Sequence, residues 1–467
     1  MRIRFLGATG QVTGSNYHVE VNDHTFAVDC GLYQGTTFEE KQNREPFQYN
    51  PSDLDFLILT HAHIDHSGRI PLLVKEGFRG RIYCTRPTAE LANILLQDSG
   101  KISEAEAEWE NKKRERAGLE KVRPLYTQDD ALEALAYLNP VDYDTWIEIG
   151  HDLLIQFKDA GHLLGSAFIE VRLKENGKWR QAVFSGDLGT GSNPLLPPPI
   201  RPEKADILIV ESTYGNRLHK DMELRGQRLG EAILKTVRRG GTVIIPAFAV
   251  GRTQEVLYEL KNFMATHPDG HELTSIPIYI DSPLAIDATA IFKHNYAYLK
   301  PTIVEQFESG NNPIGFSNLH IVRDMSYSIM LNKDTKAKVV VSASGMCDAG
   351  RIKHHLKHQL WKDNNTVIFI GYQGEGTLGR AIKTGKSPVV ILGETVKIAS
   401  DVVDIPGFSG HADAGQLIDW CRGIKETPKH VFIIHGEPDA SKALQEKMSH
   451  DLRWEATIPK ADEMVEI

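Results

Sequence analysis

The sequence has few cysteines and lacks any hydrophobic run of membrane length. Its four cysteines lie far apart and form no C-x-x-C pair: Cys30, Cys84, Cys347 and Cys421. This usage excludes a disulfide-stabilised scaffold and a cysteine-based zinc or redox motif. No apolar run approaches the roughly 18 residues of a membrane-spanning helix, and the first residues, MRIRFLGATG, read as a strand rather than a secretory leader. We therefore expect a cytoplasmic protein with reduced thiols and no membrane partner.

Positive charge is also in short supply. The chain carries 53 Lys and Arg against 62 Asp and Glu, a formal net charge of −9. Such a chain does not coat nucleic acid by bulk attraction, so any site for a polyanion must be a focused one.

Internal repeats and low-complexity tracts are absent. The pattern of predicted strands and helices changes twice along the chain. Short β-like segments run to about residue 200, where the proline-rich stretch NPLLPPPIRPEKAD marks a boundary. Apolar strands then alternate with helical segments to about residue 390, which is typical of a parallel sheet covered on both faces. We predict an α/β protein whose first domain, residues 1–200, is completed by residues 391–467 and interrupted by a second domain, residues 201–390.

A highly charged stretch interrupts the first domain between residues 100 and 139, with EAEAEWENKKRERAGLEK at its start. The charge pattern predicts an exposed helix. We interpret it as a solvated face rather than a binding surface.

One short motif, THAHIDHSG, places three histidines and an aspartate within six residues, directly after the apolar run LDFLIL: His61, His63, Asp65 and His66. The two histidines of the extended exit point to one side, and Asp65 and His66 begin a helix. One metal cannot easily use four ligands from six consecutive residues. The motif therefore predicts a two-metal site, with ions about 3.5–4 Å apart.

Further ligands stand at the ends of other strands. His162 in DAGHLLGS, Asp187 in VFSGDLG and His435 in VFIIHGE each follow an apolar run and lie beside glycine. An aspartate with two oxygens is suited to bridging two cations, so we expect Asp187 to be the bridge.

These motifs resemble those of the β-CASP ribonucleases, a family of the metallo-β-lactamase superfamily that includes bacterial ribonuclease J and the nuclease of eukaryotic mRNA 3′-end formation. The resemblance extends over essentially the whole chain. Beyond THAHIDHSG it rests on Glu211 in LIVESTYG, His411 in GFSGHAD and His435 in IIHGE. It implies an αββα sandwich with an inserted parallel-sheet β-CASP domain. The compact chain is most similar to the short bacterial members.

The resemblance also implies roles for individual residues. One zinc ion would be held by His61, His63 and His162, and a second by Asp65, His66 and His435, with Asp187 between them. Asp29, in FAVDCG, would orient a ligand histidine through a hydrogen bond. Manganese also suits such His/Asp sites.

The implied reaction is hydrolysis of RNA phosphodiester bonds by a metal-activated hydroxide. The leaving oxygen needs a proton, and His411 is the candidate general acid, with Glu211 holding its imidazole protonated and oriented.

Two Gly- and Ser-rich turns in the second domain, SASGM and GYQGEGTLGR, follow apolar strands and are suited to cradling phosphates. The candidate substrate-binding residues in them are Ser342, Ser344, Gly345, Gly371, Gln373, Thr377 and Arg380.

Two other functions remain open on the sequence alone. One is a thioesterase or lactonase of the same metal fold, which would lack the insert and the Glu211 and His411 motifs. The other is a pseudo-nuclease that binds RNA without cleaving it, but every ligand position is filled here. The sequence leaves open whether RNA would be cut internally or from the 5′ end, and whether the protein is a monomer or a dimer.

Overall fold

The computed structural model describes residues 1–35, 37–175, 177–374 and 376–467 and divides the chain into two units. Unit 1 comprises Met1–Gly191, Pro198–Leu218 and His411–Ile467, and unit 2 comprises Ser192–Pro197 and His219–Gly410. The unit boundaries thus lie about 20 residues beyond those that the sequence predicts near 200 and 390. The reason is that strands far apart in the sequence pair with one another, which the local pattern of residue types does not reveal.

Unit 1 is built on two sheets that face each other. The first has the order β21 (Glu463–Glu466), β1 (Arg2–Phe5), β2 (Tyr17–Val21), β3 (His24–Val28), β4 (Phe56–Ile58), β5 (Arg81–Thr85) and β6 (Leu138–Val141). The second has the order β20 (His430–Ile434), β11 (Ile207–Glu211), β10 (Lys178–Phe184), β9 (Ala167–Glu175), β8 (Leu153–Asp159) and β7 (Ile147–Gly150). Buried side chains of both sheets, such as Phe26 and Ile169, form the core between them.

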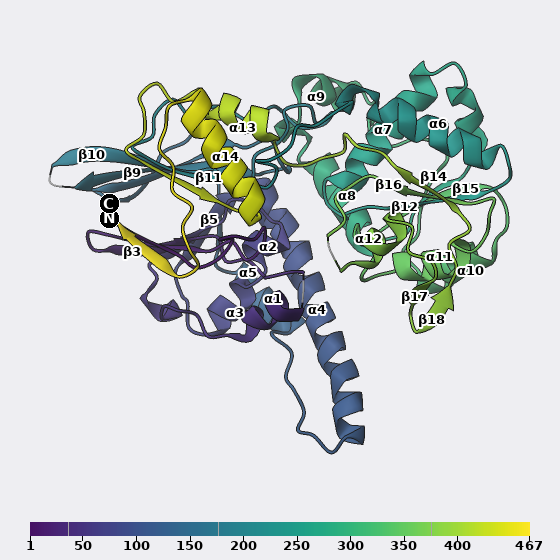
Figure 1. Cartoon of the computed structure of the whole chain (residues 1–467), viewed down its shortest axis with the longest axis horizontal. Coiled ribbons are helices and arrows are strands. Elements are labelled where there is room, and N and C mark those ends of the chain that lie inside the picture. The colour runs from purple at the N-terminus through teal and green to yellow at the C-terminus, as the bar shows by residue number, and fades with distance from the viewer. Residues whose placement is uncertain (36, 176, 375) are drawn as a thin grey trace. The chain divides into compact units, whose positions relative to one another are not determined.

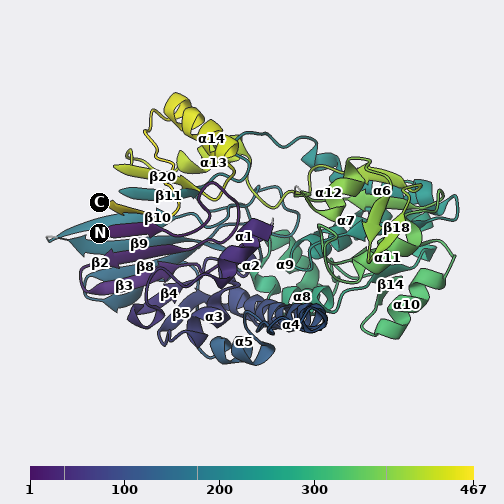
Figure 2. The same ribbon diagram turned by 60° about the horizontal axis from the view of Figure 1, so that its bottom comes forward.

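Helices cover the outer faces of this sandwich. On one side lie α1 (Thr37–Lys41), α2 (Ile64–Ser67), α3 (Ile70–Lys75), α4 (Arg86–Arg116) and α5 (Gln128–Leu135), and on the other α13 (Ala414–Cys421) and α14 (Pro438–Asp451) (Figures 1 and 2). Leu417 and Leu444 of the last two helices pack on Leu208 and Val431 of the second sheet. This is the predicted αββα arrangement.

The two chain ends lie together in the first sheet. β1 pairs antiparallel with β21, so that Arg2 lies opposite Glu466 (Figure 1). Among the helices that the structure describes, none combines the length and the apolar character needed to cross a membrane.

Unit 2 contains a sheet in which every strand pair is parallel, as the sequence predicts. Its order is β14 (Leu319–Ile321), β13 (Ile278–Ile280), β15 (Lys338–Ser342), β12 (Thr242–Pro246), β16 (Thr366–Phe369) and β19 (Asp401–Asp404). β19 joins the edge of this sheet through the register Thr366↔Asp401, which is why the insert extends past residue 390.

The other elements of unit 2 are α6 (Arg225–Val237), α7 (Arg252–Thr266), α8 (Pro283–His294), α9 (Pro301–Glu308), α10 (Met325–Lys333), α11 (Ile352–Gln359), α12 (Leu378–Lys383) and the hairpin β17 (Val389–Ile391) to β18 (Glu394–Val396). Both faces of the parallel sheet are buried. Val243 and Ile245 of β12 point into one core and Ile244 into another, which explains the continuous apolar run of that strand.

Most of the chemistry-bearing residues of unit 1 follow strands that run parallel to a neighbour; His162 instead follows β8, which is antiparallel to β7 and β9. β3, β4 and β5 form one parallel group, and β10, β11 and β20 form another. Parallel strands bring their carboxyl ends to one edge of a sheet, where side chains of the following loops converge. Asp29, His61, Asp187 and His435 follow β3, β4, β10 and β20 in this way, and Glu211 is the last residue of β11.

Candidate metal centre

The loop after β4 and the first turn of α2 supply four of the predicted ligands, two each. β4 is a buried strand between β3 and β5, so the chain leaves the sheet at a fixed place. The first turn of α2 begins after His63, whose carbonyl accepts the backbone N–H groups of His66 and Ser67. His61 therefore lies on the extended exit and His66 on the helix, as the sequence predicts.

A first group of ligand atoms is formed by His61, His63, His162 and Asp187, all within 4.8 Å of one another. His63 Nδ1 lies 3.0 Å from His61 Nε2 and 3.1 Å from His162 Nε2. Asp187 Oδ2 lies 3.5 Å from His61 Nε2 and 3.6 Å from His162 Nε2. Four donor atoms thus surround one point.

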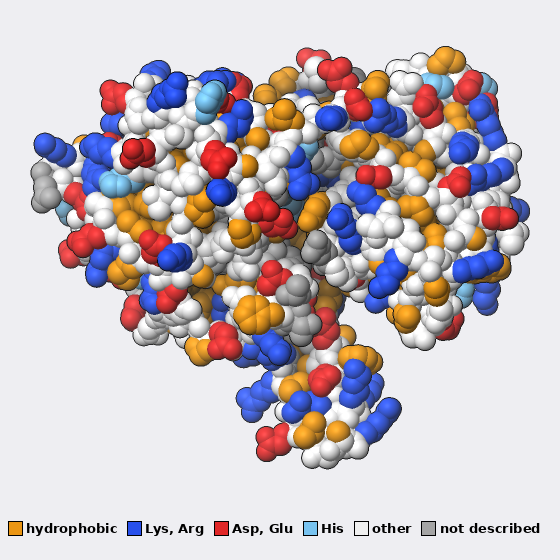
Figure 3. Space-filling model, in the orientation of Figure 1, with side chains coloured by type: hydrophobic (Ala, Val, Ile, Leu, Met, Phe, Trp, Pro, Cys, Tyr) orange, Lys and Arg blue, Asp and Glu red, His pale blue; other side chains and the backbone are white. Residues whose placement is uncertain are grey.

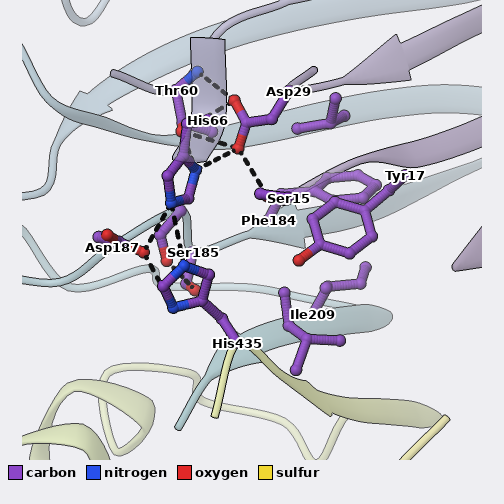
Figure 4. Close-up of a pocket in the computed structure, with 13 residues that line it drawn as sticks. Ser15, Tyr17, Asp29, Thr60, His66, Phe184, Ser185, Asp187, Ile209 and His435 are labelled. Atoms are coloured by element: carbon purple, nitrogen blue, oxygen red, sulfur yellow. Dashed lines mark hydrogen bonds and ion pairs between the residues drawn. The ribbon is translucent and has the colours of Figure 1, made fainter. Parts of the chain in front are cut away.

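A second group is formed by Asp65, His66 and His435. His66 Nε2 lies 3.1 Å from His435 Nε2, and Asp65 Oδ2 lies 3.7 Å from that same His435 atom. The other oxygen of Asp187, Oδ1, faces this group at 3.3 Å from His66 Nε2 (Figure 4). Asp187 therefore turns one carboxylate oxygen to each group.

The donor chemistry fits two cations. Asp187 Oδ1 is buried and has no hydrogen-bond donor among the described residues. A buried carboxylate oxygen without a partner is costly in a folded protein, and a metal ion removes that cost. The set of five imidazoles and two carboxylates is of the kind that zinc prefers.

Hydrogen bonds fix the ring orientation of His66. Its Nδ1 lies 2.7 Å from Asp29 Oδ2, and Asp29 also accepts from Thr60 and Ser15 (Figure 4). A proton on Nδ1 leaves the lone pair of Nε2 directed at the second ligand group. The structure thus contains the hydrogen bond through which the resemblance implies that Asp29 orients a ligand histidine.

Thr213 does the same for His435, and nothing in the sequence pointed to it beyond its place two residues after Glu211. Thr213 Oγ1 donates to the backbone carbonyl of His435 at 3.2 Å and lies 3.1 Å from His435 Nδ1. With its hydrogen on the carbonyl, the hydroxyl oxygen accepts from Nδ1–H in the tautomer that leaves Nε2 unprotonated, and Nδ1 also lies 3.5 Å from Asp187 Oδ1. The lone pair of His435 Nε2 then faces that of His66 at 3.1 Å, an arrangement that a cation relieves.

Burial and charge set the protonation of the ligands. Burial lowers the pKa of His61 well below its ordinary value and that of His63 to about 4. Burial acts to raise the pKa of Asp187, but the positive charges of His435, His66 and His411 outweigh it and hold this pKa well below its ordinary value. Burial acts to lower the pKa of His66 as well, but the charges of Asp187, Asp29 and Asp65 outweigh it and hold this pKa well above its ordinary value. Metal binding requires neutral imidazoles and an ionised bridging carboxylate, so an ion in the second group would displace a proton from His66.

His411 and Glu211 form a third part of the site. Glu211 is fully buried, and its Oε2 lies 3.3 Å from His411 Nδ1. Its Oε1 also accepts the backbone N–H of Leu188 at 2.6 Å, which fixes the carboxylate. Burial acts to lower the pKa of His411, but the charges of Glu211 and Asp187 raise it to about 9. The pair presents a protonated imidazole beside the ligand groups.

Asp187, Glu211 and His411 also lie close enough to hold a cation by themselves. The oxygens of Glu211, however, already accept from the backbone of Leu188 and Thr213, and those of Asp187 face the other two groups. This third group therefore has no uncommitted carboxylate oxygen for an ion of its own.

The predicted substrate-binding residues lie in and beside two adjoining turns of unit 2, with Ser342 at the end of β15 and Arg380 in α12. Gln373 bridges these turns, since its Nε2 donates to the carbonyl of Gly345 at 2.9 Å and to that of Gly371 at 3.4 Å. Ser342 is buried and donates to the carbonyl of Asp281, and Thr377 caps α12 by accepting the N–H of Arg380. These polar side chains hold the turns in shape. Ser344 also supports its own turn, because its hydroxyl accepts the N–H of Ala349 at 3.4 Å.

The fold and this site together define a metal-dependent hydrolase of the metallo-β-lactamase type. Family models match three parts of the chain: a metallo-β-lactamase superfamily domain at residues 18–182, a Beta-Casp domain at 253–382, and a Zn-dependent metallo-hydrolase RNA specificity domain at 395–459. The chain belongs to the β-CASP family of the metallo-β-lactamase superfamily.

Relatives extend over nearly the whole chain. Ribonuclease TTHA0252 of Thermus thermophilus is 38% identical over 444 residues, 95% of either chain. The RNase J-like protein of Methanocaldococcus jannaschii is 32% identical and covers 93% of this chain and 92% of its own. The transcription termination factor FttA of the same organism is 32% identical over 94% of this chain, which spans 67% of that protein.

A solved structure of a protein of unknown function from Enterococcus faecalis superposes with a TM-score of 0.56 over 99% of both chains, at 13% identity. That likeness concerns the fold alone.

Proposed function

We propose that this protein is a two-zinc ribonuclease that hydrolyses phosphodiester bonds of RNA. The observation that carries the proposal is the buried Asp187 carboxylate, whose two oxygens face two separate groups of ligand atoms. The RNA substrate is supported by the RNA specificity domain model and by relatives that are named ribonucleases.

One zinc would be held by His61, His63 and His162, the other by Asp65, His66 and His435, with Asp187 shared. When bound, such ions supply Lewis-acid chemistry that activates water and offsets charge on phosphoryl oxygens. Manganese would be the alternative metal.

The chain itself supplies the proton for the leaving group. The leaving ribose oxygen departs with negative charge, and an acid placed beside it lowers the barrier. His411 Nδ1 is engaged with Glu211 on one side of the ring. Nε2, on the opposite side, is the atom that would donate. Glu211 is a positioning residue, because it orients the imidazole and favours its charged form.

We further propose that the two turns joined by Gln373 contact the RNA backbone. The backbone N–H groups and Arg380 are the elements suited to phosphate, because the side chains of Ser342 and Thr377 already serve the fold. The cytoplasmic location and the choice between monomer and dimer stay predictions from the sequence.

The test is a gel time-course on one RNA that is labelled at its 3′ end and carries either a 5′-monophosphate or a 5′-triphosphate. Progressive shortening only with the monophosphate would indicate a 5′→3′ exonuclease. Discrete internal fragments with both ends would indicate an endonuclease. If the metal-loaded protein leaves all RNA intact but hydrolyses a thioester, the ribonuclease proposal is wrong, and RNA binding without any turnover would identify a pseudo-nuclease.

The matched variant is His411→Ala. It should keep both metal ions, measured by plasma mass spectrometry, and lose most turnover. If metal content fell in parallel with activity, His411 would be a ligand rather than the acid.

A further inference from the structure

Helix α4 extends well beyond the part of it that packs on unit 1. The buried residues of this 31-residue helix are concentrated before Gly100, which contacts the start of α5, and Ala107 is the one buried residue after it. Figure 1 shows the distal half of α4 leaving the body of unit 1 together with the segment that returns from it. At about 1.5 Å per residue the free part from Gly100 to Arg116 is about 24 Å long. We call residues 101–126 the arm and residues 109–123 its tip.

The arm has a defined structure. Asn111 exchanges two hydrogen bonds with the backbone of Val122, at 2.7 and 2.9 Å. The N–H of Leu119 donates to the carbonyl of Arg114, and Ser103 Oγ accepts the N–H of Leu125 at 2.9 Å. The returning segment is therefore tied along the helix, and the tip is a preformed surface.

Charge is separated along the arm. Residues 101–110 carry four glutamates and one lysine, whereas residues 111–123 carry six basic and two acidic side chains. Space-filling shows Lys and Arg side chains gathered at the end of the arm, with hydrophobic atoms among them (Figure 3). In a chain with a net charge of −9, this is the focused positive surface that a polyanion site requires.

Helix electrostatics explains only part of this cluster. Basic residues in the last turn of a helix complement its dipole, which accounts for Lys113, Arg114 and Arg116. Lys121 and Arg123 lie outside the helix. Within the part of the chain that the structure describes, no acidic side chain forms an ion pair with Arg116, Lys121 or Arg123.

An exposed tryptophan lies in the same tip. Trp109 is 61% exposed, and the ammonium group of Lys113 lies 3.0 Å from its ring centroid. Tryptophan contributes most when its face is covered, and a cation beside an aromatic ring is the combination on which single-stranded nucleic acids stack their bases. Leu119, 55% exposed, is the other large apolar side chain there, which is too little apolar area for a stable protein interface.

We propose that the arm tip binds single-stranded RNA at a second contact, separate from the metal centre, with Trp109 stacking on a base and Lys113, Arg116 and Lys121 contacting phosphates. This inference rests on the proposed ribonuclease function and adds substrate selection to it. Long RNA reaches both contacts, whereas a short fragment reaches only the metal centre.

The test compares KM and kcat on an RNA of about 30 nucleotides and on an 8-nucleotide fragment of it. The tip variant is Lys113→Gln/Arg116→Gln/Lys121→Gln. The matched control, Lys178→Gln/Lys204→Gln/Lys429→Gln, removes the same charge from exposed positions elsewhere on unit 1. The tip variant should raise KM for the long RNA about tenfold, leave its kcat unchanged, and leave the short RNA unaffected. The salt dependence of long-RNA binding should weaken by a slope of about 2, the value for three lost phosphate contacts on a single strand.

Trp109→Ala should weaken long-RNA binding about tenfold without changing the salt dependence of that binding. Trp109→Phe should retain most of the wild-type affinity, because its ring can still stack on a base. Equal effects of the tip and control variants, or equal effects on long and short RNA, would overturn the inference. If the tip variant lost affinity for poly-glutamate while RNA binding stayed unchanged, the tip would belong to an acidic protein partner instead. A wild-type protein that cleaves neither RNA would count against the proposed function, whereas cleavage that ignores the tip would count against this inference alone.

Discussion

Two buried aspartates, Asp187 in unit 1 and Asp281 in unit 2, have opposite surroundings. Asp281 is fully buried, and its oxygens accept from Arg351 at 2.6 Å, from Ser328 at 2.5 Å, and pair with His355 at 2.6 Å. Asp187 is equally buried, but its Oδ1 has no hydrogen-bond donor in the described chain. A satisfied carboxylate of this kind holds a fold together, whereas an unsatisfied one among imidazoles is a place for a cation.

The histidines beside them differ in the same way. His355 engages both ring nitrogens, one with Asp281 and the other with Asn332 at 2.9 Å. His435 places Nδ1 beside Thr213 and 3.5 Å from Asp187 Oδ1, and directs Nε2 at His66 and Asp65. A cluster of His and Asp is therefore not in itself a metal site, and the number of nitrogens left for a ligand distinguishes the two.

The largest expected effect is that of Asp187→Asn. Removing the shared carboxylate should lower RNA turnover by about 1,000-fold or more, since several kcal/mol of metal-dependent stabilisation are lost and each ~1.4 kcal/mol is tenfold. Metal content should fall while circular dichroism shows a folded chain. A variant that kept two ions and normal cleavage would remove the bridging role.

Asp281→Asn should affect stability instead. It leaves the partly buried Arg351 guanidinium and the buried His355 without their carboxylate, so the free energy of unfolding should fall by about 3 kcal/mol, with metal content unchanged. Denaturant unfolding measures this. The control is Asp287→Asn, which breaks an exposed pair with Arg323 and should cost under about 1 kcal/mol. Equal losses in the two variants would show that the Asp281 network is not structural.

Thr213→Val should lower metal affinity about 10- to 100-fold, because the hydroxyl no longer fixes the tautomer of His435. Titration with a competing chelator measures this independently of turnover, and the loss should affect one of the two ions first. Thr213→Ser keeps the hydroxyl and should behave like the wild type. Identical metal affinities of the Val and Ser variants would contradict the positioning role.

The smallest expected effect concerns a carboxylate that has neither metal nor arginine. Burial raises the pKa of Asp159 to about 7. The backbone N–H of Gly161 donates to this carboxylate at 2.8 Å and acts to lower the pKa, but its effect is smaller than that of burial. A raised pKa means that the folded state favours the protonated acid. The contribution of this protonated carboxyl group to the free energy of unfolding is complete below about pH 4 and is lost as the pH rises through about 7.

Asp159→Asn should remove this pH dependence and stabilise the protein by about 1–2 kcal/mol at pH 8, a value reduced from the full shift because the side chain is half-buried. Unfolding midpoints at pH 5 and pH 8 measure it. If the variant were less stable than the wild type at pH 8, the carboxylate would be accepting a bond that the raised pKa does not reflect.

Prediction from the sequence succeeded where the evidence was local. THAHIDHSG named four candidate ligands, and the structure brings their side chains together with those of His162, Asp187 and His435, because six consecutive residues at a strand-to-helix corner can adopt few orientations. The alternation of strands and helices likewise indicated the parallel-sheet insert, whereas the sandwich was implied by the resemblance to the family. The residues around 400 were assigned to the wrong unit, because β19 joins its sheet by pairing with β16, more than 30 residues earlier.

The sequence also could not predict which polar side chains find hydrogen-bond partners within the fold, because those partners lie far away in the sequence. Ser342, in a turn suited to phosphates, uses its hydroxyl on the carbonyl of Asp281, 61 residues away. Thr213 orients His435, 222 residues away, and a threonine after an acidic motif carries no local sign of that role. The charged stretch that begins after residue 100 lies exposed on α4, as the sequence predicts, but charges alone do not show how far that helix projects.

The sequence by itself determined the class of fold and the family and named the candidate metal ligands, because these depend on residue type and short-range spacing. The tertiary structure alone decided which oxygen of Asp187 faces which group, which histidine nitrogens remain for a cation, and which buried carboxylates are satisfied. Those properties depend on atoms that lie within about 3 Å of one another only after distant strands have paired.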